Sequence, residues 1–337
     1  MLAMAIEVHD RAARCKKRRW LISSILISLL CFEVAYADDY PAGVVTIIVP
    51  FPPAGATDQL GRLIAKGLSE RLGRPVIVEN HAGAGGAIGA SIAARAAADG
   101  HTLLMAGSTL VIEQVLGSKL GFNPERDLVP VALLAEGPLI LVASPSLGIK
   151  SVSELLILAR QHPGQLAYAS VGSGSHTHLA GEMLKAEAHV DLLHVPYKGG
   201  APALLAVIGG QVAVGIMSPL TAMENIRAGK VSALAVTGVR RLRVLPSVPT
   251  LAESGVPRFE LEMWSAIFVP AKTPREIVAR LSKEIVAVVQ SAEVARTIED
   301  QGAFIVTSGP DEVSRRIQSD FASTSRLVKA VNLKVDE

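Results

Sequence analysis

Three glycine-rich turns constrain the fold of this chain more than any other feature of its sequence. Residues 51–58, 83–86 and 195–203 each follow a short β-branched run and open a helical pattern. A strand-turn-helix junction of this kind presents backbone N–H groups at the end of a strand, where a small anion can be held. The sequence contains no equally clear catalytic constellation, so we expect a binding protein and no enzyme.

Apolar residues recur with strand and helix spacing in alternation. Strand patterns at 44–49, 75–79 and 102–105 alternate with helix patterns at 57–72 and 86–98, which predicts a parallel sheet with right-handed crossovers. The alternation then repeats, and the chain ends in helices. Further strands are expected at 166–169, 192–195, 212–216 and 232–237, and helices at 151–161, 175–186, 201–208, 221–228, 273–290, 292–301 and 310–329, with Ser151 and Thr273 as N-caps.

Two apolar stretches connect the two halves of this pattern. Residues 129–143 predict two strands around a bend at 136–138, and 260–269 predict a returning strand. A chain that crosses twice between two lobes forms a hinge with a cleft beside it. The expected lobes are 38–141 together with 263–337, and 142–262.

The N-terminus has the pattern of an export signal. Residues 16–19 are basic, 21–32 are apolar but too few to span a bilayer comfortably, and Ala35 and Ala37 fit the small-x-small cleavage rule. We expect residues 1–37 to be a cleaved signal peptide and the mature protein to be periplasmic.

Both cysteines, Cys15 and Cys31, fall within this predicted signal, so the exported chain would have no disulfide and would depend on its core for stability. Three alternatives stay open: an uncleaved anchor, twin-arginine export, and a lipid attached at Cys31. The last is disfavoured because Leu30 is larger than the residue that usually precedes a lipidated cysteine.

The charge of the mature chain excludes some classes of partner. The formal charge of +2 depends on the signal, which holds six basic and three acidic residues; the remaining 27 basic and 28 acidic residues give a net charge of −1. Nucleic acid and anionic membrane surfaces are therefore not expected partners. Aromatic residues make up 4% of the chain, which disfavours a platform for stacked bases or sugars.

The first turn has the features of an anion site. Gly55 permits a positive φ or close approach of a ligand, and Thr57 or Asp58 can cap the helix that follows. The positive end of that helix would face the ligand. The alternative is an ordinary capped turn. The candidate ligand residues of this turn are Ala54, Gly55, Thr57 and Asp58.

The second turn resembles a dinucleotide-binding fingerprint but lacks its third glycine. Counting from Gly83, the sixth position is Ile88, and no phosphate-binding G-x-x-x-x-G-K motif occurs elsewhere. We therefore expect no cofactor. The candidate ligand residues here are Gly83, Gly85 and Gly86.

A serine- and histidine-rich turn at 171–178 provides neutral donors at a helix start. Ser175 and His176 are adjacent, so they would not face each other on a helix, and the G-x-S-x-G pattern of a hydrolase is absent. His176 and His178 diverge in the same way, so no metal site is expected. Ser173, Ser175 and Thr177 are neutral donors that suit an oxygen-rich ligand. The candidate ligand residues of this turn are Ser173, Ser175 and His176.

The last turn adds Tyr197, which can donate to a ligand or line the cleft, and Gly199 at a helix start. Both are candidate ligand residues. We interpret Lys198 between them as an ordinary solvated lysine.

These motifs, in this order, resemble the Bug-type extracytoplasmic solute receptors of tripartite tricarboxylate transporters. The matching segments are 48–58, 75–86, 99–104, 194–203, 209–212, 228–230 and 245–255, within a resemblance that covers 40 to about 329. The resemblance implies an α/β, two-lobed periplasmic-binding-protein-like fold with a hinge and an interlobe cleft. It also implies a small carboxylate ligand, membrane transporter subunits as partners, and ligand roles for Gly55, Thr57, Gly85, Ser173, Ser175 and Tyr197. We expect a monomer.

The chain departs from the family pattern at three positions. Ala54 stands where the family often has glycine, and Ala213 and Met217 stand where it often has aspartate. We expect a less acidic cleft and a ligand without an ammonium group. Two alternative functions stay open: a ligand-sensing receptor for a two-component sensor, and an exported hydrolase that uses Ser175.

Overall fold

The structure, a computed structural model, describes residues 40–117 and 121–331. Both sheets belong to one compact unit that begins at Gly43. The signal peptide predicted at 1–37 lies outside the described residues. No helix within the described ranges is long and apolar enough to cross a membrane.

A six-stranded sheet is built around the parallel unit that the sequence predicted. β1 (Val45–Val49) pairs in parallel with β2 (Val76–Asn80) and β3 (Thr102–Gly107). β10 (Glu262–Pro270) is antiparallel to both β3 and β4 (Leu128–Pro138), so β4 runs in the same direction as β3. The strand order is β11-β4-β10-β3-β1-β2.

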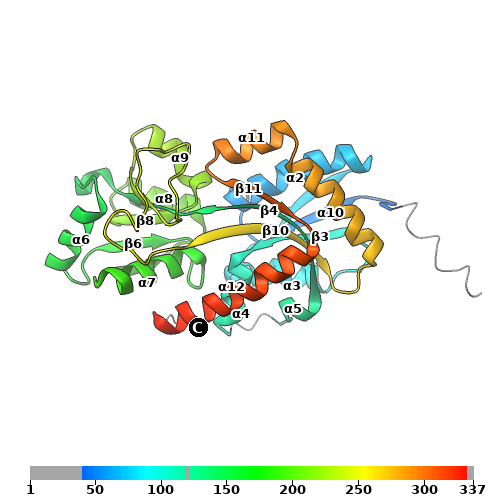
Figure 1. The fold of residues 1–337 in the computed structure, drawn as a ribbon, viewed down its shortest axis with the longest axis horizontal. Helices are drawn as coiled ribbons and strands as arrows, with labels where there is room; N and C mark the ends of the chain where they lie inside the picture. Colours follow the sequence, from blue (N-terminus) through cyan, green and yellow to red (C-terminus); the bar gives the residue numbers. More distant parts are fainter. Residues whose placement is uncertain (1–39, 118–120, 332–337) are drawn as a thin grey trace, which may run out of the picture. The chain divides into compact units, whose positions relative to one another are not determined.

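Helices cover both faces of this sheet, and the sheet with its helices is lobe 1 (Figure 1). α2 and α10 pack together on one face, and α4 and α12 pack together on the other. The elements besides the strands above are α2 (Ala56–Leu72), η1 (Ala84–Gly86), α3 (Ala87–Ala94), α4 (Ser108–Val115), α5 (Pro124–Asp127), α10 (Arg275–Val289), α11 (Ala292–Asp300), β11 (Phe304–Ser308) and α12 (Pro310–Ala330).

A five-stranded sheet with the order β7-β6-β8-β5-β9 forms lobe 2 with its helices. β6 is parallel to β7 and β8, and β5 is antiparallel to β8 and β9. The elements are β5 (Ile140–Ala143), η2 (Pro145–Leu147), α6 (Val152–Gln161), β6 (Ala167–Ser170), α7 (His176–Ala188), β7 (Leu193–Pro196), α8 (Gly200–Ile208), β8 (Val214–Met217), α9 (Pro219–Arg227) and β9 (Ser232–Val236). The predicted α/β fold class with two lobes is confirmed.

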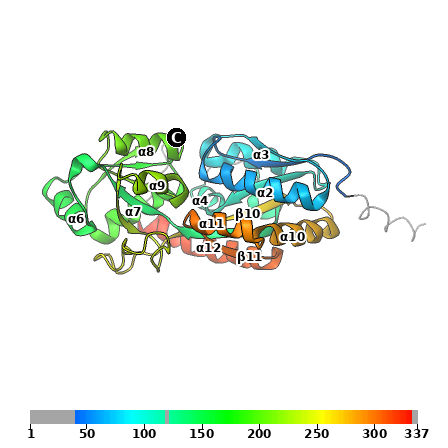
Figure 2. The ribbon, with the colours of Figure 1, turned by 90° about the horizontal axis from the view of Figure 1, so that it is seen from above.

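The two sheets are joined through Leu139 and through the segment 237–261. The Leu139 N–H donates to Thr237 Oγ1 at 2.8 Å, and the Thr237 hydroxyl donates to the Leu261 carbonyl at 2.6 Å, which ties the two connections together. The bend predicted at 136–138 lies instead at Leu139, because 136–138 remain paired with β10. In Figure 2, α6, α8 and α9 of lobe 2 lie at one end and α2, α3 and α10 of lobe 1 at the other. The C-terminal end of α12 reaches across and packs against the core of lobe 2 through Leu327 and Val328.

Several local predictions were wrong. Neither α4 nor β11 was expected. The start of α4 is β-branched and typical of a strand, but Val111 and Ile112 are buried against the sheets, and that packing outweighs local propensity. β11 is a short edge strand that depends on pairing with β4.

Two helix ends also differ from the prediction. α3 ends at Ala94 instead of residue 98, and the N-cap of α10 is Pro274 instead of Thr273. Ser151 does cap α6 as expected, since its side chain accepts the Glu154 N–H.

Candidate functional site

The carboxyl ends of six strands meet across the gap between the lobes. In lobe 1, β1, β2 and β3 end at the edge where β4 leaves for the hinge. In lobe 2, β8 ends opposite Ile140, the first residue of β5, and β6 and β7 run parallel to β8. The two sets of loops lie close together: a side-chain carbon placed on Gly199 would be 3.8 Å from Pro52 Cγ.

Six helices therefore begin at this gap, and four of them have no side-chain cap. α2, α3, α4 and α8 each start after a glycine, at Gly55, Gly86, Gly107 and Gly199, and within the described part of the chain these starts have no side-chain cap hydrogen bond. Only α7 and α9 are capped, by Ser175 and Ser218. The first N–H groups of a helix lack intrahelical partners and carry partial positive charge, so the uncapped starts suit a small anion.

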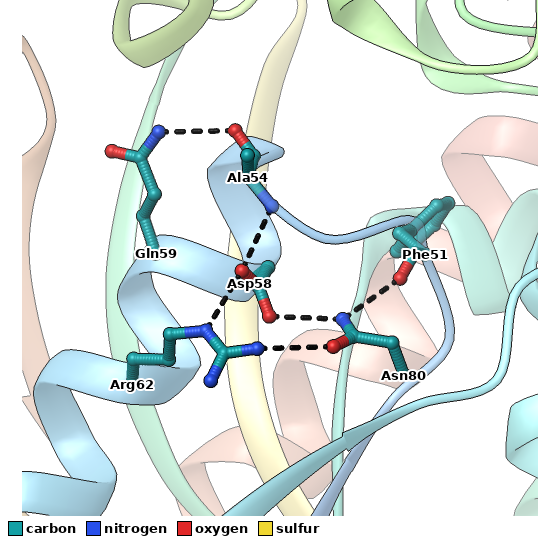
Figure 3. Close-up of polar contacts among 6 residues, drawn as sticks. All are labelled: Phe51, Ala54, Asp58, Gln59, Arg62 and Asn80. Carbon is teal, nitrogen blue, oxygen red and sulfur yellow. Dashed lines mark hydrogen bonds and ion pairs between the residues drawn. The ribbon is translucent and has the colours of Figure 1, made fainter.

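The first loop, residues 51–58, is held in place by the buried carboxylate of Asp58 (Figure 3). Asp58 Oδ2 accepts the Ala54 N–H at 2.9 Å and Arg62 Nε at 3.0 Å, while Asp58 Oδ1 accepts Asn80 Nδ2 at 2.9 Å. Asn80 also donates to the Phe51 carbonyl. Burial alone would raise the pKa of Asp58, but these hydrogen bonds together hold the pKa below its usual value.

This geometry corrects two expectations for the first loop. The helix begins after Gly55, and neither Thr57 nor Asp58 caps it; Asp58 reaches back to Ala54 instead. The left-handed residue is Ala54, with φ 64°, whereas Gly55 has φ −76°. An alanine therefore occupies the conformation that favours glycine.

The second loop is an unbroken left-handed run. Gly83, Ala84, Gly85 and Gly86 have φ values of 137°, 46°, 61° and 104°. Gly85 also lies against Glu113 of α4: a side-chain carbon at Gly85 would be 1.9 Å from Glu113 Oε1. The positive φ and the close approach of Glu113 together favour glycine at position 85.

In the third loop, Ser175 serves the loop itself. Its hydroxyl donates to the Gly172 carbonyl at 2.6 Å, and its oxygen accepts the His178 N–H. Because the single hydroxyl proton is given to a carbonyl, Ser175 is not arranged as a nucleophile beside a histidine base. Ser173 lies in the same loop and is partly exposed.

The two histidines of this loop point to different partners. His178 is buried and stacks on His194 with ring centres 3.8 Å apart, so it supports the core of lobe 2. His176 Nδ1 lies 2.9 Å from Thr109 Oγ1 of α4. Although the residue keeps some exposure, burial lowers the pKa of its ring to about 4, so it is neutral at pH 7.

In the fourth loop, Tyr197 and Gly199 are tied to β6. The Tyr197 N–H donates to the Ser170 carbonyl, and the Gly199 N–H donates to the Val171 carbonyl at 3.2 Å. The Tyr197 ring is partly buried against the core of lobe 2. Lys198 is exposed, as expected for a solvated lysine.

Six of the twelve candidate residues line hollows around the gap, and these six are divided among four different hollows. Thr57 shares a hollow of about 80 Å³ with Ser218 and Ser265. Ala54 and Gly55 line a groove of about 620 Å³ between α2, α8, α9 and α11. Gly85 and Gly86 line a small hollow with Thr109 and Glu113, and His176 lines another beside the hinge.

Sequence reasoning missed the loops that start α4 and α9. Thr109 lies in the first turn of α4, which was not expected as a helix. Ser218 followed by Pro219 is an N-cap and first-turn signature that could have placed the start of α9 two residues earlier than the expected Thr221.

The structure does not support the expectation that Ala213 and Met217 make the cleft less acidic. The Met217 side chain is fully buried in the core of lobe 2, and Ala213 lies before the amino end of β8, away from the gap. These two positions therefore do not make the cleft of this chain less acidic.

Comparison with known proteins decides the family. The profile of the tripartite tricarboxylate transporter family receptor matches residues 60–333. The chain belongs to this receptor family. The protein BugT of Bordetella pertussis is 36% identical over 301 residues, which cover 89% of this chain and 92% of BugT. The predicted resemblance to the Bug-type receptors is thereby confirmed.

Two solved members of this kind superimpose on the receptor. Rpa4515 of Rhodopseudomonas palustris, solved with adipate, is 34% identical with a TM-score of 0.85, and covers 88% of this chain and 99% of its own. MatC of Rhodopseudomonas palustris, solved with malate, is 33% identical with a TM-score of 0.81, and the match covers 86% of this chain and 100% of MatC. The receptor is therefore a periplasmic solute-binding protein of this family.

Proposed function

We propose that this receptor captures a small dicarboxylate between its lobes and holds it mainly through backbone N–H groups at helix starts. The observation that carries the proposal is the set of four uncapped, glycine-started helices that face one gap. A carboxylate there would accept charge-assisted hydrogen bonds, which are stronger than neutral ones. Because contacts to both lobes form only when the lobes are close, the ligand would stabilise the closed state.

The ligand class follows from both relatives and geometry. Adipate and malate, present in Rpa4515 and MatC, each carry two carboxylates and no ammonium group. Uncapped helix starts lie in both lobes, those of α2, α3 and α4 in lobe 1 and that of α8 in lobe 2, and they suit a ligand with an anionic group at each end.

The proposed contacts divide the candidate residues by role. Gly55, Thr57, Gly85, Gly86, Ser173, Tyr197 and Gly199 would surround the ligand, while Ala54, Asp58, Gly83 and Ser175 would shape the loops that present these groups. The lobe boundaries 38–141 with 263–337, and 142–262, remain a proposal. The division of the strands between two sheets supports it, except that β5 of the second sheet already begins at Ile140.

A thermal-shift screen tests the proposal. Purified mature protein would be mixed with malate, adipate, mono- and tricarboxylates, and with adipamide as an uncharged control of nearly the same shape as adipate. A ligand that binds only the folded state raises the melting temperature with its concentration. We expect a shift with a dicarboxylate and none with adipamide. Equal shifts with adipate and adipamide would contradict the anion site.

We also propose that the loaded receptor delivers its ligand to the membrane subunits of a tripartite transporter, after export with cleavage before Asp38. The alternative partner is the periplasmic domain of a sensor kinase. Capture by tagged transporter subunits that increases with ligand would support delivery, whereas capture only by the sensor domain would support the alternative. Mass spectrometry of periplasmic protein would show whether its first residue is Asp38.

A further inference from the structure

Two hydrogen bonds between side chains cross from one lobe to the other within the described residues. One joins Arg243 to Glu299 of α11 at the exposed surface, at 2.8 Å, and the other joins Thr109 to His176. Thr109 is in the first turn of α4 in lobe 1, and His176 is the first residue of α7 in lobe 2. Thr109 Oγ1 and His176 Nδ1 are 2.9 Å apart, and Thr109 is 8% exposed. The bond can form only while the lobes are close, because its two partners belong to different lobes.

The chemistry of this pair suits a neutral contact. A threonine hydroxyl can donate to, or accept from, the Nδ1 atom of a neutral imidazole. When the lobes separate, water can replace both partners, so the net contribution of the bond to closure is modest. Neither atom carries a charge at neutral pH that would compete with an anionic ligand.

α4 also connects this pair to the second glycine loop. Thr109 and Glu113 are four residues apart, on one face of the helix. Both line the same small hollow as Gly85 and Gly86, and Glu113 Oε1 lies against Gly85. A change in this loop on ligand binding would therefore be passed through α4 to the contact with lobe 2.

We propose that the side chains of Thr109 and His176 form a latch that favours the closed lobes without themselves touching the ligand, and so strengthens the binding of every ligand by the same factor. The latch rests on the proposed binding function, but it concerns how the two lobes are positioned and not which groups bind the ligand. The sequence motif made His176 a candidate for ligand contact. In this proposal His176 instead favours closure of the lobes by bonding to Thr109.

Charged groups surround the latch on several elements, and they bear on its pH dependence. The hollow of about 580 Å³ beside His176 is lined by Glu260 and Glu262 from the hinge and by Arg316, Asp320 and Arg326 from α12. Arg316 pairs with Asp320 and with Glu136. On α4, Glu113 follows Thr109 by one turn.

The test measures the distance between the lobes without added ligand. The mature chain has no cysteine of its own, since both lie in the predicted signal, so a spin label can be placed at each of two exposed positions. Ile92 on α3 and Leu193 at the start of β7 are 41% and 56% exposed and belong to different lobes. Distance distributions would be recorded for the doubly labelled protein with each latch variant.

Four variants separate the latch from general structure. Thr109→Val removes the hydroxyl at nearly constant volume, and Thr109→Ser restores it. His176→Leu removes the other partner. Thr307→Val is the matched control, since Thr307 is also in lobe 1 but bonds Gln290 within that lobe.

We expect Thr109→Val to reduce the ratio of closed to open protein by roughly three- to tenfold, and Thr109→Ser to restore it. His176→Leu should lower the ratio of closed to open protein by the same factor. The double variant with Thr109→Val and His176→Leu should lower this ratio no further. The affinities for adipate and malate should fall by one common factor. Thr307→Val should leave the distances unchanged.

Three results would overturn the latch. The first is a wild-type protein with no closed population in the absence of ligand. The second is a Thr109→Val variant with unchanged lobe distances. The third is an effect of His176→Leu that differs strongly between adipate and malate, which would indicate direct contact with the ligand. The distance measurement needs no ligand, so a failure of the proposed dicarboxylate site would be recognised separately.

Discussion

Asp58→Asn should weaken both the fold and the ligand site, because the carboxylate holds the first loop. In the structure its two oxygens accept three hydrogen bonds, from Ala54, Arg62 and Asn80, and its side chain is 3% exposed. An amide in the same place must turn its NH2 group toward one of these donors. At least one buried donor then loses its acceptor, and the charge that strengthens the others is gone.

The expected loss can be estimated from these contacts. A hydrogen bond to a charged group contributes ~1.5–3 kcal/mol, and a buried donor left unsatisfied costs ~1–3 kcal/mol. We expect the free energy of unfolding to fall by about 3 kcal/mol. Because the pKa of Asp58 is lowered in the folded state, its contribution is present above the ordinary value of 3.8 and is lost as the pH falls through the lowered pKa.

Urea denaturation at pH 7 measures this loss, and the thermal shift given by the bound dicarboxylate measures the effect on the site. Asp99→Asn is the matched control: Asp99 accepts the His101 N–H, but its side chain is 57% exposed. We expect the control to cost less than about 1 kcal/mol. If Asp58→Asn costs no more than Asp99→Asn, the reasoning about the buried carboxylate is refuted.

Three further predictions concern Gly85, His176 and Ala54. Gly85→Ala should lower the free energy of unfolding by at least ~1 kcal/mol more than Gly73→Ala, measured by urea denaturation, because both have a positive φ but only position 85 collides with Glu113. Ligand affinity should fall between pH 8 and pH 5, because burial lowers the pKa of His176 from 6.5 to about 4 and so opposes its protonation in the closed protein. The fall would reach roughly 30-fold when opening exposes the ring fully. A flat pH profile in calorimetric titration would contradict this, and His176→Asn should flatten the profile. Ala54→Gly should change stability by less than about 1 kcal/mol, because relief of the left-handed conformation offsets the entropy of glycine, whereas Ala54→Val should lower the melting temperature.

Much of the architecture could be predicted because its signals are local. β1, α2 and β2 follow directly from apolar spacing between glycine and proline turns, and Ser151 is a standard N-cap. The parallel unit follows from the alternation of strands and helices. The edge strand β11 has no such signal, because it is stabilised by a partner more than 160 residues away in the sequence.

The details of the site were less predictable because they depend on contacts between distant segments. The bond from Asn80 to Asp58 joins residues 22 positions apart, and it explains why Asp58 does not act as a cap. The latch joins residues 67 positions apart. Met217 was expected near the cleft, but a fully buried strand has no alternation that reveals which way each side chain points.

The central claim is that backbone N–H groups at helix starts hold the carboxylate, and amide-resolved NMR tests it most directly. Isotope-labelled mature protein would be titrated with the carboxylate that gives the largest thermal shift. We predict the largest amide shifts in the first turns of α2, α3, α4 and α8, and small ones at the start of α6, which Ser151 caps. Shifts confined to other segments, with those four first turns unchanged at saturation, would contradict the account.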